Sequence, residues 1–173
     1  MGQISHFTGK WETSPLTHNA GFSQVHPNRS AWTARGERHL IAAKLGKRLS
    51  VLAALLSTGE VIRANLWQST TAEAFSGFLG LLKNVVQKPL TAILDNASIH
   101  KAKSLEPIVT YLKTQEVTLY FLPPYSPELN RIERFWHAMK FTWRAPKCRD
   151  SKILEADVDE ILDNFGTKYQ FAF

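Results

Sequence analysis

The sequence predicts one α/β domain with a mixed sheet flanked by helices. The chain has 173 residues, of which 44% are hydrophobic, enough for a single substantial core. From residue 47 onward, apolar strand-like segments alternate with segments of helical periodicity, an order typical of layered α/β folds. The short apolar segment Leu90–Leu94 runs directly into Asp95. Ligand contacts in open α/β sheets lie at such strand ends.

The first half of the predicted core is a hairpin followed by a helix. In chain order we expect a strand at 48–56, a turn at 57–60, a return strand at 61–67 and a helix at 72–86. Residues 69–71 offer a helix N-cap, and Pro89 ends the helix.

The second half continues the alternation. We expect a strand at 90–94, a helix at 103–116, a strand at 117–122, a proline-rich loop at 123–127, a helix at 130–143 and an acidic helix at 153–165. Pro107 lies near the start of its helix, where a missing N–H costs least. The first 46 residues fit less well. Residues 32–41 are a candidate early strand, whereas residues 1–19 show neither strand nor helix periodicity.

Charge and cysteine content narrow the classes of function. The net charge is +6, but residues 1–149 carry +10 and residues 150–173 carry −4. A basic body favours a polyanionic partner such as nucleic acid, although many basic proteins bind none. Cys148 is the single cysteine, which excludes an internal disulfide and a multi-cysteine zinc module. The apolar runs are too short to span a membrane and no signal peptide is visible, so we expect a cytoplasmic protein.

Two carboxylates occupy positions suited to metal binding. Asp95 ends a short strand, and Glu133 lies in the first turn of the helix after the proline-rich loop. Carboxylates from a strand end and a helix start can hold Mg²⁺, which prefers oxygen ligands and can serve phosphodiester cleavage. Each residue also has a plainer interpretation: Asp95 as a turn residue, and Glu133 as compensation of the helix dipole.

The surrounding residues resemble a known family. Residues 94–100, LDNASIH, and 122–136, LPPYSPELNRIERFW, resemble the two signature blocks of DDE-type transposases. The nearest branch is that of bacterial insertion sequences related to mariner elements. The resemblance covers about residues 20–145, and the long proline block makes it specific. It implies a ribonuclease H-like fold and metal-dependent DNA cleavage and strand transfer.

The resemblance assigns site residues. Asp95 matches the second metal-binding aspartate and Glu133 the terminal glutamate, with 37 residues between them. The residues that match positions beside the site are Asn96, His100 and Asn130. His100 has a direct role or is a turn or cap residue. Glu128 belongs to the loop block, and Arg131 stands where many relatives carry proline.

The first acidic residue of the family has no match. In the family, an Asp-Glu pair ends the first strand just before an Ala-Gly-Phe segment. Here His18-Asn19 precedes Ala20-Gly21-Phe22, and residues 1–94 contain no aspartate. Glu12 lies too far upstream, and the imidazole of His18 suits Mg²⁺ poorly. We therefore expect that the first strand is missing or replaced, that no residue substitutes for the acid, and that binding of Mg²⁺ or Mn²⁺ is impaired.

Basic residues in and after the third helix predict DNA contact. The candidates are Arg131, Arg134, Lys140, Arg144 and Lys147, interleaved with aromatic residues. Such cations neutralise phosphates and make binding salt-dependent. The alternative is an amphipathic helix whose aromatic residues are core and whose cations are its solvated face.

Together these observations predict a three-part chain. Residues 1–19 are unassigned and look unrelated to the rest, residues 20–149 form an N-terminally truncated DDE transposase-like catalytic domain, and residues 150–173 form an acidic helix and tail. We expect a transposase-type domain that acts on DNA in a bacterial, nucleoid-associated setting and lacks catalysis as it stands. The alternative is a non-catalytic DNA-binding or interaction protein derived from a transposase. The oligomeric state stays open, a homo-oligomer included.

Overall fold

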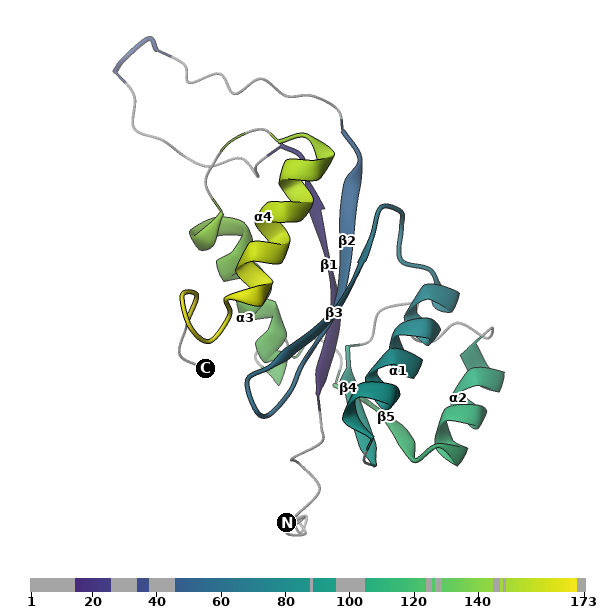
Figure 1. Ribbon diagram of the computed structural model, residues 1–173. Coiled ribbons are helices and arrows are strands. Elements are labelled where there is room, and N and C mark those ends of the chain that lie inside the picture. Colours follow the sequence, from purple (N-terminus) through teal and green to yellow (C-terminus); the bar gives the residue numbers. More distant parts are fainter. Residues whose placement is uncertain are drawn as a thin grey trace.

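A five-stranded mixed sheet with helices on both faces forms the fold (Figure 1). The computed structural model describes residues 15–25, 34–37, 46–87, 89–95, 105–123, 126, 129–144, 147 and 149–170. The strands are β1 (Leu16–Ser23), β2 (Arg48–Leu55), β3 (Val61–Leu66), β4 (Leu90–Leu94) and β5 (Val117–Phe121). The helices are α1 (Ala72–Val86), α2 (Glu106–Thr114), α3 (Arg131–Ala138), which continues as a π-helical segment (Met139–Trp143), and α4 (Ser151–Asp163). The described helices include none long and apolar enough to cross a membrane.

The strand order is β3-β2-β1-β4-β5. β1 runs antiparallel to β2 and parallel to β4, and β4 runs parallel to β5. The β2–β3 hairpin and the two βαβ crossovers, through α1 and α2, agree with the predicted order of elements. The predicted mixed α/β sheet is therefore confirmed.

β1 corrects the expectation that the first strand is missing. It occupies the centre of the sheet and starts at Leu16, inside the segment that the sequence left without periodicity. One face of the strand carries Leu16, Ala20 and Phe22, but His18 interrupts this apolar series. β1 forms because β2 pairs with its whole length, from Leu16 opposite Leu55 to Ser23 opposite Arg48. It also spans the expected boundary at residue 19.

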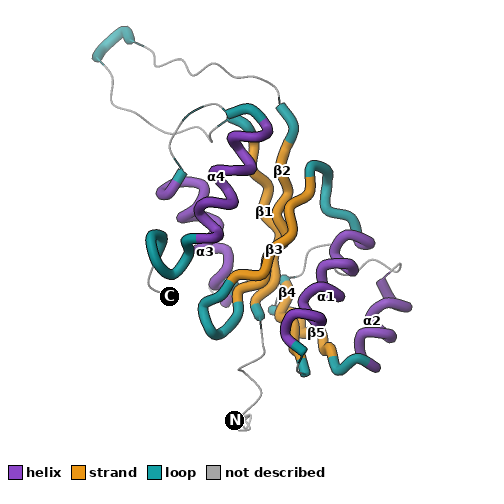
Figure 2. The backbone as a smooth tube through the Cα atoms, viewed as in Figure 1, coloured by secondary structure: helices purple, strands orange, loops and turns teal. Residues whose placement is uncertain are grey.

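Helices lie on both faces of the sheet (Figure 2), and an apolar layer holds them to each face. Alternate residues of each strand point to opposite faces. On one face, Phe22 and Val51 pack with Phe135 of α3 and Leu154 of α4. On the other face, the core residues are Leu52, Phe75, Phe78, Leu82, Leu94 and Leu112, which join β2 and β4 to α1 and α2. α4 thus completes the core layer to which α3 belongs.

Most helix positions agree with the sequence. Thr71 caps α1 by accepting a hydrogen bond from the backbone N–H of Ala74, at 3.2 Å. α4 begins two residues earlier than expected because the Asp150 side chain caps it, accepting from the N–H of Ile153 at 2.8 Å. The single helix expected at 130–143 instead changes to π-helical geometry at Met139. Of the candidate early strand at 32–41, the described residues 34–37 form a turn, and the rest lie outside the described residues.

Candidate active site

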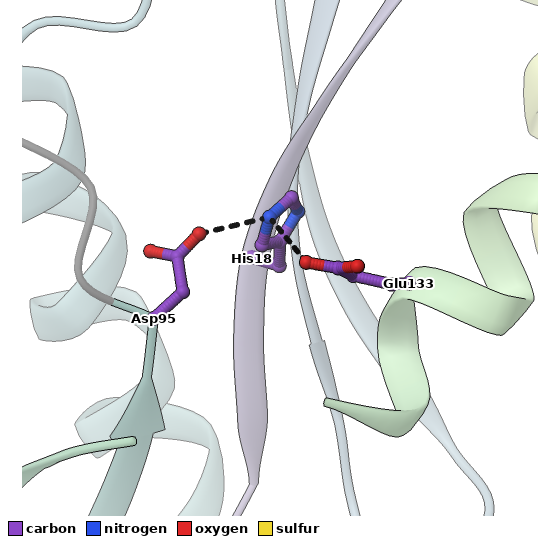
Figure 3. A group of neighbouring side chains, drawn as sticks. All are labelled: His18, Asp95 and Glu133. Carbon is purple, nitrogen blue, oxygen red and sulfur yellow. Dashed lines mark ion pairs between the residues drawn. The ribbon is translucent and has the colours of Figure 1, made fainter. Parts of the chain in front are cut away.

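Three side chains from three elements meet at the centre of the sheet. His18 comes from β1, Asp95 directly follows β4, and Glu133 lies in the first turn of α3 (Figure 3). Nε2 of His18 lies 3.0 Å from Oδ2 of Asp95 and 3.8 Å from Oε1 of Glu133. The imidazole therefore lies within ion-pair distance of both predicted catalytic carboxylates.

Sheet register places His18 beside Asp95. β1 and β4 run parallel, with Thr17 opposite Leu94. The residues that follow them, His18 and Asp95, therefore lie side by side. β4 ends there, whereas β1 continues for six more residues. On the other side, Ile132 and Trp136 of α3 are buried against the β1 layer, which turns Glu133 toward the strand.

His18 is the third member of this cluster. The sequence predicts that no residue takes over the role of the family's first acid, and that role stays a prediction, whereas the structure brings the His18 imidazole within reach of both other candidate residues. Glu12, the other candidate, lies outside the described residues. On the sequence alone, His18 is an unfavourable candidate because imidazole suits Mg²⁺ poorly. The strand that carries it was not predicted, although Leu16, His18, Ala20 and Phe22 alternate along one face of β1.

The three side chains do not fit a pair of Mg²⁺ ions. Their ligand atoms all lie within 4.8 Å of one another, and they supply two carboxylates and one imidazole. Two-metal sites place their ions about 3.5–4 Å apart, and Mg²⁺ takes oxygen ligands, whereas imidazole suits Zn²⁺, Cu²⁺, Fe²⁺ or Ni²⁺. Nδ1 of His18 is buried and has no hydrogen-bond partner among the described residues. A histidine metal ligand almost always has such a partner.

The residues expected beside the site are only partly described. Asn130 precedes α3, is 3% exposed, and donates from Nδ2 to Oε1 of Glu133 at 3.4 Å. That contact restrains the same carboxylate oxygen that lies 3.8 Å from Nε2 of His18. Asn96, His100 and Glu128 lie outside the described residues.

The basic residues expected to contact DNA fall into two groups. Arg131, Arg134 and Lys147 are exposed. Arg144, in contrast, is 3% exposed, and burial, reinforced by nearby Arg149 and opposed by Asp157, lowers its pKa to about 10. Burial also lowers the pKa of Lys140, and the positive charges of Arg48 and Arg144 add to the effect. The structure therefore sets Lys140 and Arg144 apart from the exposed cations.

Two of the aromatic residues between these cations are core. Phe135 is fully buried and Trp136 nearly so, and the Phe135 ring packs edge-on against Trp136 and Phe165, with centroids 4.9 Å away in each case. The interpretation as core is confirmed for these two residues, whereas Phe141 is only partly buried. The alternative that all cations form a solvated face is wrong for Arg144, since its guanidinium is buried over the Phe22 ring, 5.3 Å from the ring centroid.

A small hollow of about 230 Å³ is lined by two of the three site residues, His18 and Glu133. It lies between β1 and α3, and its lining includes His18, Asn19, Glu133, His137 and Lys140. Trp136, also in the lining, has a buried indole N–H without a partner among the described residues. Through this hollow, a ligand from solvent can reach the His18 imidazole and the Glu133 carboxylate.

Comparison with solved structures places the fold among transposases and integrases. A Mos1 mariner paired end complex with Mn matches with a TM-score of 0.68 and 17% identity, over 88% of this chain and 48% of that one. The catalytic core domain of BIV integrase matches with a TM-score of 0.52 and 15% identity, over 93% of this chain and 88% of that one. The chain thus spans about half the length of the Mos1 chains. These likenesses confirm the ribonuclease H-like fold.

Sequence comparisons identify the family. A segment of 51 residues is 41% identical to the uncharacterized protein y4pE/y4sA of Sinorhizobium fredii, over 30% of this chain and 33% of that protein. A family model for the DDE superfamily endonucleases matches residues 19–155, most of the chain and the segments that carry Asp95 and Glu133. With the sheet order and the position of those carboxylates, this match shows that the chain belongs to the DDE superfamily endonucleases.

Proposed function

We propose that the chain is a transposase-type domain that binds DNA and whose cleavage step is disabled at His18. The observation that carries this proposal is the imidazole of His18, which lies between the Asp95 and Glu133 carboxylates. A DDE-type site needs acidic oxygen ligands to hold divalent ions for cleavage and strand transfer. In this chain, the side chain nearest both carboxylates is His18, which offers a nitrogen atom in place of an acidic oxygen.

The same observation accounts for impaired metal binding. Divalent ions serve DDE-type endonucleases, and Mos1 paired end complexes have been solved with Mn and with Mg. In this chain, His18 presents a nitrogen ligand beside Asp95 and Glu133, whereas Mg²⁺ prefers oxygen ligands. We propose that Mg²⁺ and Mn²⁺ bind weakly for that reason, and that DNA, in a bacterial nucleoid, is the partner.

This proposal has two forms. In the first, which the imidazole at residue 18 supports, the protein is a non-catalytic DNA-binding protein derived from a transposase. In the second, the protein still cleaves DNA with a metal that accepts an imidazole ligand. The two forms differ in whether the unmodified chain nicks DNA with a metal that accepts imidazole, such as Zn²⁺ or Fe²⁺. Both forms retain Asp95, Glu133 and the sheet. In either form, the departure from the family's site is the His18 side chain.

Nicking of supercoiled plasmid tests the proposal. The unmodified chain is expected to leave the plasmid intact with Mg²⁺, and His18→Asp to nick it on the order of a hundredfold faster, the size of effect that a misplaced site group has. β1 already carries residue 18 to the correct place, so one substitution suffices. His18→Asn, which supplies no charge, is the matched control, and His18→Asp with Asp95→Asn is expected to be inactive.

Two results would contradict this proposal. Nicking by the unmodified chain with Mg²⁺, abolished by Asp95→Asn, would show that the histidine-containing site is active. Failure of the folded His18→Asp variant to nick with either Mg²⁺ or Mn²⁺ would show that the defect lies elsewhere.

A further inference from the structure

A second hollow lies farther along β1, beyond the three site residues. It has a volume of about 390 Å³ and is lined by Gly21, Phe22, Ser23, Arg48, Lys140, Phe141 and Arg144. Three of these residues are cations, and the lining includes no carboxylate among the described residues. Because a water molecule takes up about 30 Å³ in the liquid, the hollow has room for a hydrated anionic group.

The three cations lack the carboxylate partners that other basic side chains have. Arg63 pairs with Asp159 and Asp163 of α4, at 3.1 and 2.7 Å, and Arg149 pairs with Asp157. Within the described part of the chain, Arg48, Lys140 and Arg144 form no ion pair with a carboxylate. The acidic helix α4 thus neutralises one set of cations and leaves this set unneutralised.

Arg144 has hydrogen-bonding capacity that the fold leaves unused. Its guanidinium lies 5.3 Å from the centre of the Phe22 ring and donates from Nη2 to the backbone oxygen of Ser23 at 3.3 Å. Its Nε is buried and has no partner within the described residues. A buried donor without a partner is costly, and an anion in the hollow would offset that cost.

Gly21 gives Arg48 its place. A Cβ at residue 21 would lie 1.7 Å from Nε of Arg48, so the guanidinium passes through the space that a side chain would take. Arg48 thereby reaches across β1 from the neighbouring strand, close enough to Lys140 and Arg144 for like charges to lower the pKa of Lys140. Holding three cations together without a counter-ion is unfavourable, and a bound anion would relieve it.

The hollow continues the candidate active site along the same strand. Lys140 and Phe141 line both hollows. β4 pairs with β1 only at Leu16 and Thr17, so beyond that point the β4-facing edge of β1 has no partner among the described strands. At about 3.3 Å per residue, Phe22 lies ~13 Å from His18. That distance corresponds to a few nucleotides of a duplex, whose charges recur about every 3.4 Å per strand.

We propose that Gly21, Arg48, Lys140 and Arg144 form a binding site for one backbone phosphate of a DNA strand that also passes the His18, Asp95 and Glu133 site. This inference rests on the proposed function, which supplies the DNA, but it concerns binding and not cleavage. The site holds the strand a few nucleotides from the candidate active site and fixes its direction along β1. Phosphate is the anion that matches a fork of two guanidinium groups and an ammonium.

Fluorescence anisotropy with a labelled 20-base-pair duplex tests the site. Lys140→Gln is expected to weaken binding about tenfold at 0.1 M salt, as loss of one charge-assisted contact does. Gly21→Ala changes no charge but displaces the Arg48 guanidinium, so it should weaken binding several-fold. Lys113→Gln is the matched control, since this exposed lysine of α2 lies on the opposite side of the sheet, and it should change affinity less than twofold.

A double-mutant cycle separates the hollow from general charge effects. Gly21→Ala should have no further effect in an Arg48→Gln background, because the displaced group is then absent. Thermal melts in sodium phosphate and in sodium chloride of equal ionic strength supply a readout without DNA. Phosphate should raise the Tm of the unmodified chain and not that of Lys140→Gln.

Several results would overturn the inference while leaving the proposed function in place. If the unmodified chain binds DNA but Gly21→Ala, Lys140→Gln and Lys113→Gln all bind equally well, the hollow holds no DNA phosphate. A phosphate-dependent Tm without any loss of DNA affinity in the variants would make it a site for a free anion instead. Tighter binding of single-stranded RNA than of DNA, with the same sensitivity to Lys140→Gln, would assign it to RNA. Nicking by His18→Asp reports on the proposed function separately.

Discussion

His18 differs from the carboxylate expected at its position in charge and in the metals it favours. Between Asp95 and Glu133 it offers nitrogen, and its Nε2 approaches both acids, so the site is held together without an ion. A carboxylate at residue 18 would instead bring three negative charges within a few ångströms. Such a cluster is stable only if a cation occupies it.

At the residue scale we therefore predict that His18→Asp makes stability depend on Mg²⁺. In EDTA the variant should melt below the unmodified chain, because the three carboxylates repel one another. Ten millimolar Mg²⁺ bound with a Kd of about 1 mM adds about 1.4 kcal/mol. For a domain of this size, that free energy corresponds to about 3–6 °C in Tm. The unmodified chain should show no such shift.

Calorimetry or a dye-based melt measures this effect, and His18→Asn is its control. The neutral amide should neither lower the Tm in EDTA nor create a response to Mg²⁺. Equal stabilisation of the unmodified chain by Mg²⁺ would contradict the assignment of His18 as the cause of weak metal binding.

At the scale of elements, α4 belongs to the same core as the sheet. Leu154 and Val158 are fully buried against it, and Arg63 and Asn65 of β3 contact Asp159 of the same helix. The acidic helix α4 is therefore packed against the sheet as part of the domain, and its other face is polar. The boundary expected at residue 149 falls at the Asp150 cap that starts this helix.

We predict that Leu154→Ala destabilises the whole domain. Removing a buried leucine side chain costs about 2–5 kcal/mol, which corresponds to a fall in Tm of about 5–15 °C. The adjacent Ile153→Ala is the matched control, since Ile153 is 46% exposed, and its effect should stay within a degree or two. Equal effects of the two substitutions in thermal melts would show that α4 is an appendage outside the cooperative unit.

At the scale of the whole molecule, charge is divided between a basic body and an acidic end. α4 folds back onto part of the body and pairs with Arg63, Lys147 and Arg149. Three cations without a carboxylate partner among the described residues, Arg48, Lys140 and Arg144, line the hollow farther along β1. Folding thus brings these three positive charges together near the candidate active site.

We predict DNA binding that depends on salt and not on sequence. If this surface neutralises about five phosphates, log K should fall with log salt at a slope of about −4.5. Anisotropy titrations of three unrelated duplexes between 50 and 200 mM NaCl should give parallel lines. Different slopes for the three duplexes, or affinity that salt leaves unchanged, would contradict binding through the phosphate backbone.

The sequence by itself determined the local elements and two of the three site residues. A continuous apolar run predicted β2 and the segment after the turn predicted β3. The Thr71 cap and Pro89 delimited α1, and the turn chemistry around Gly59 closed the hairpin. Asp95 and Glu133 stood out because a strand end and a helix start are positions that local signals mark. These features depend on neighbours in the chain, which periodicity and capping describe.

Only the tertiary structure decided what distant segments do to one another. β1 is a strand because β2 pairs with all of it, although His18 interrupts its apolar face. His18 belongs to the site because the parallel pairing of β1 and β4 sets Thr17 opposite Leu94. Arg144 is buried over the Phe22 ring, and Arg48 passes across β1 because Gly21 leaves room for its guanidinium. Burial and register are relations between segments, so no local pattern contains them.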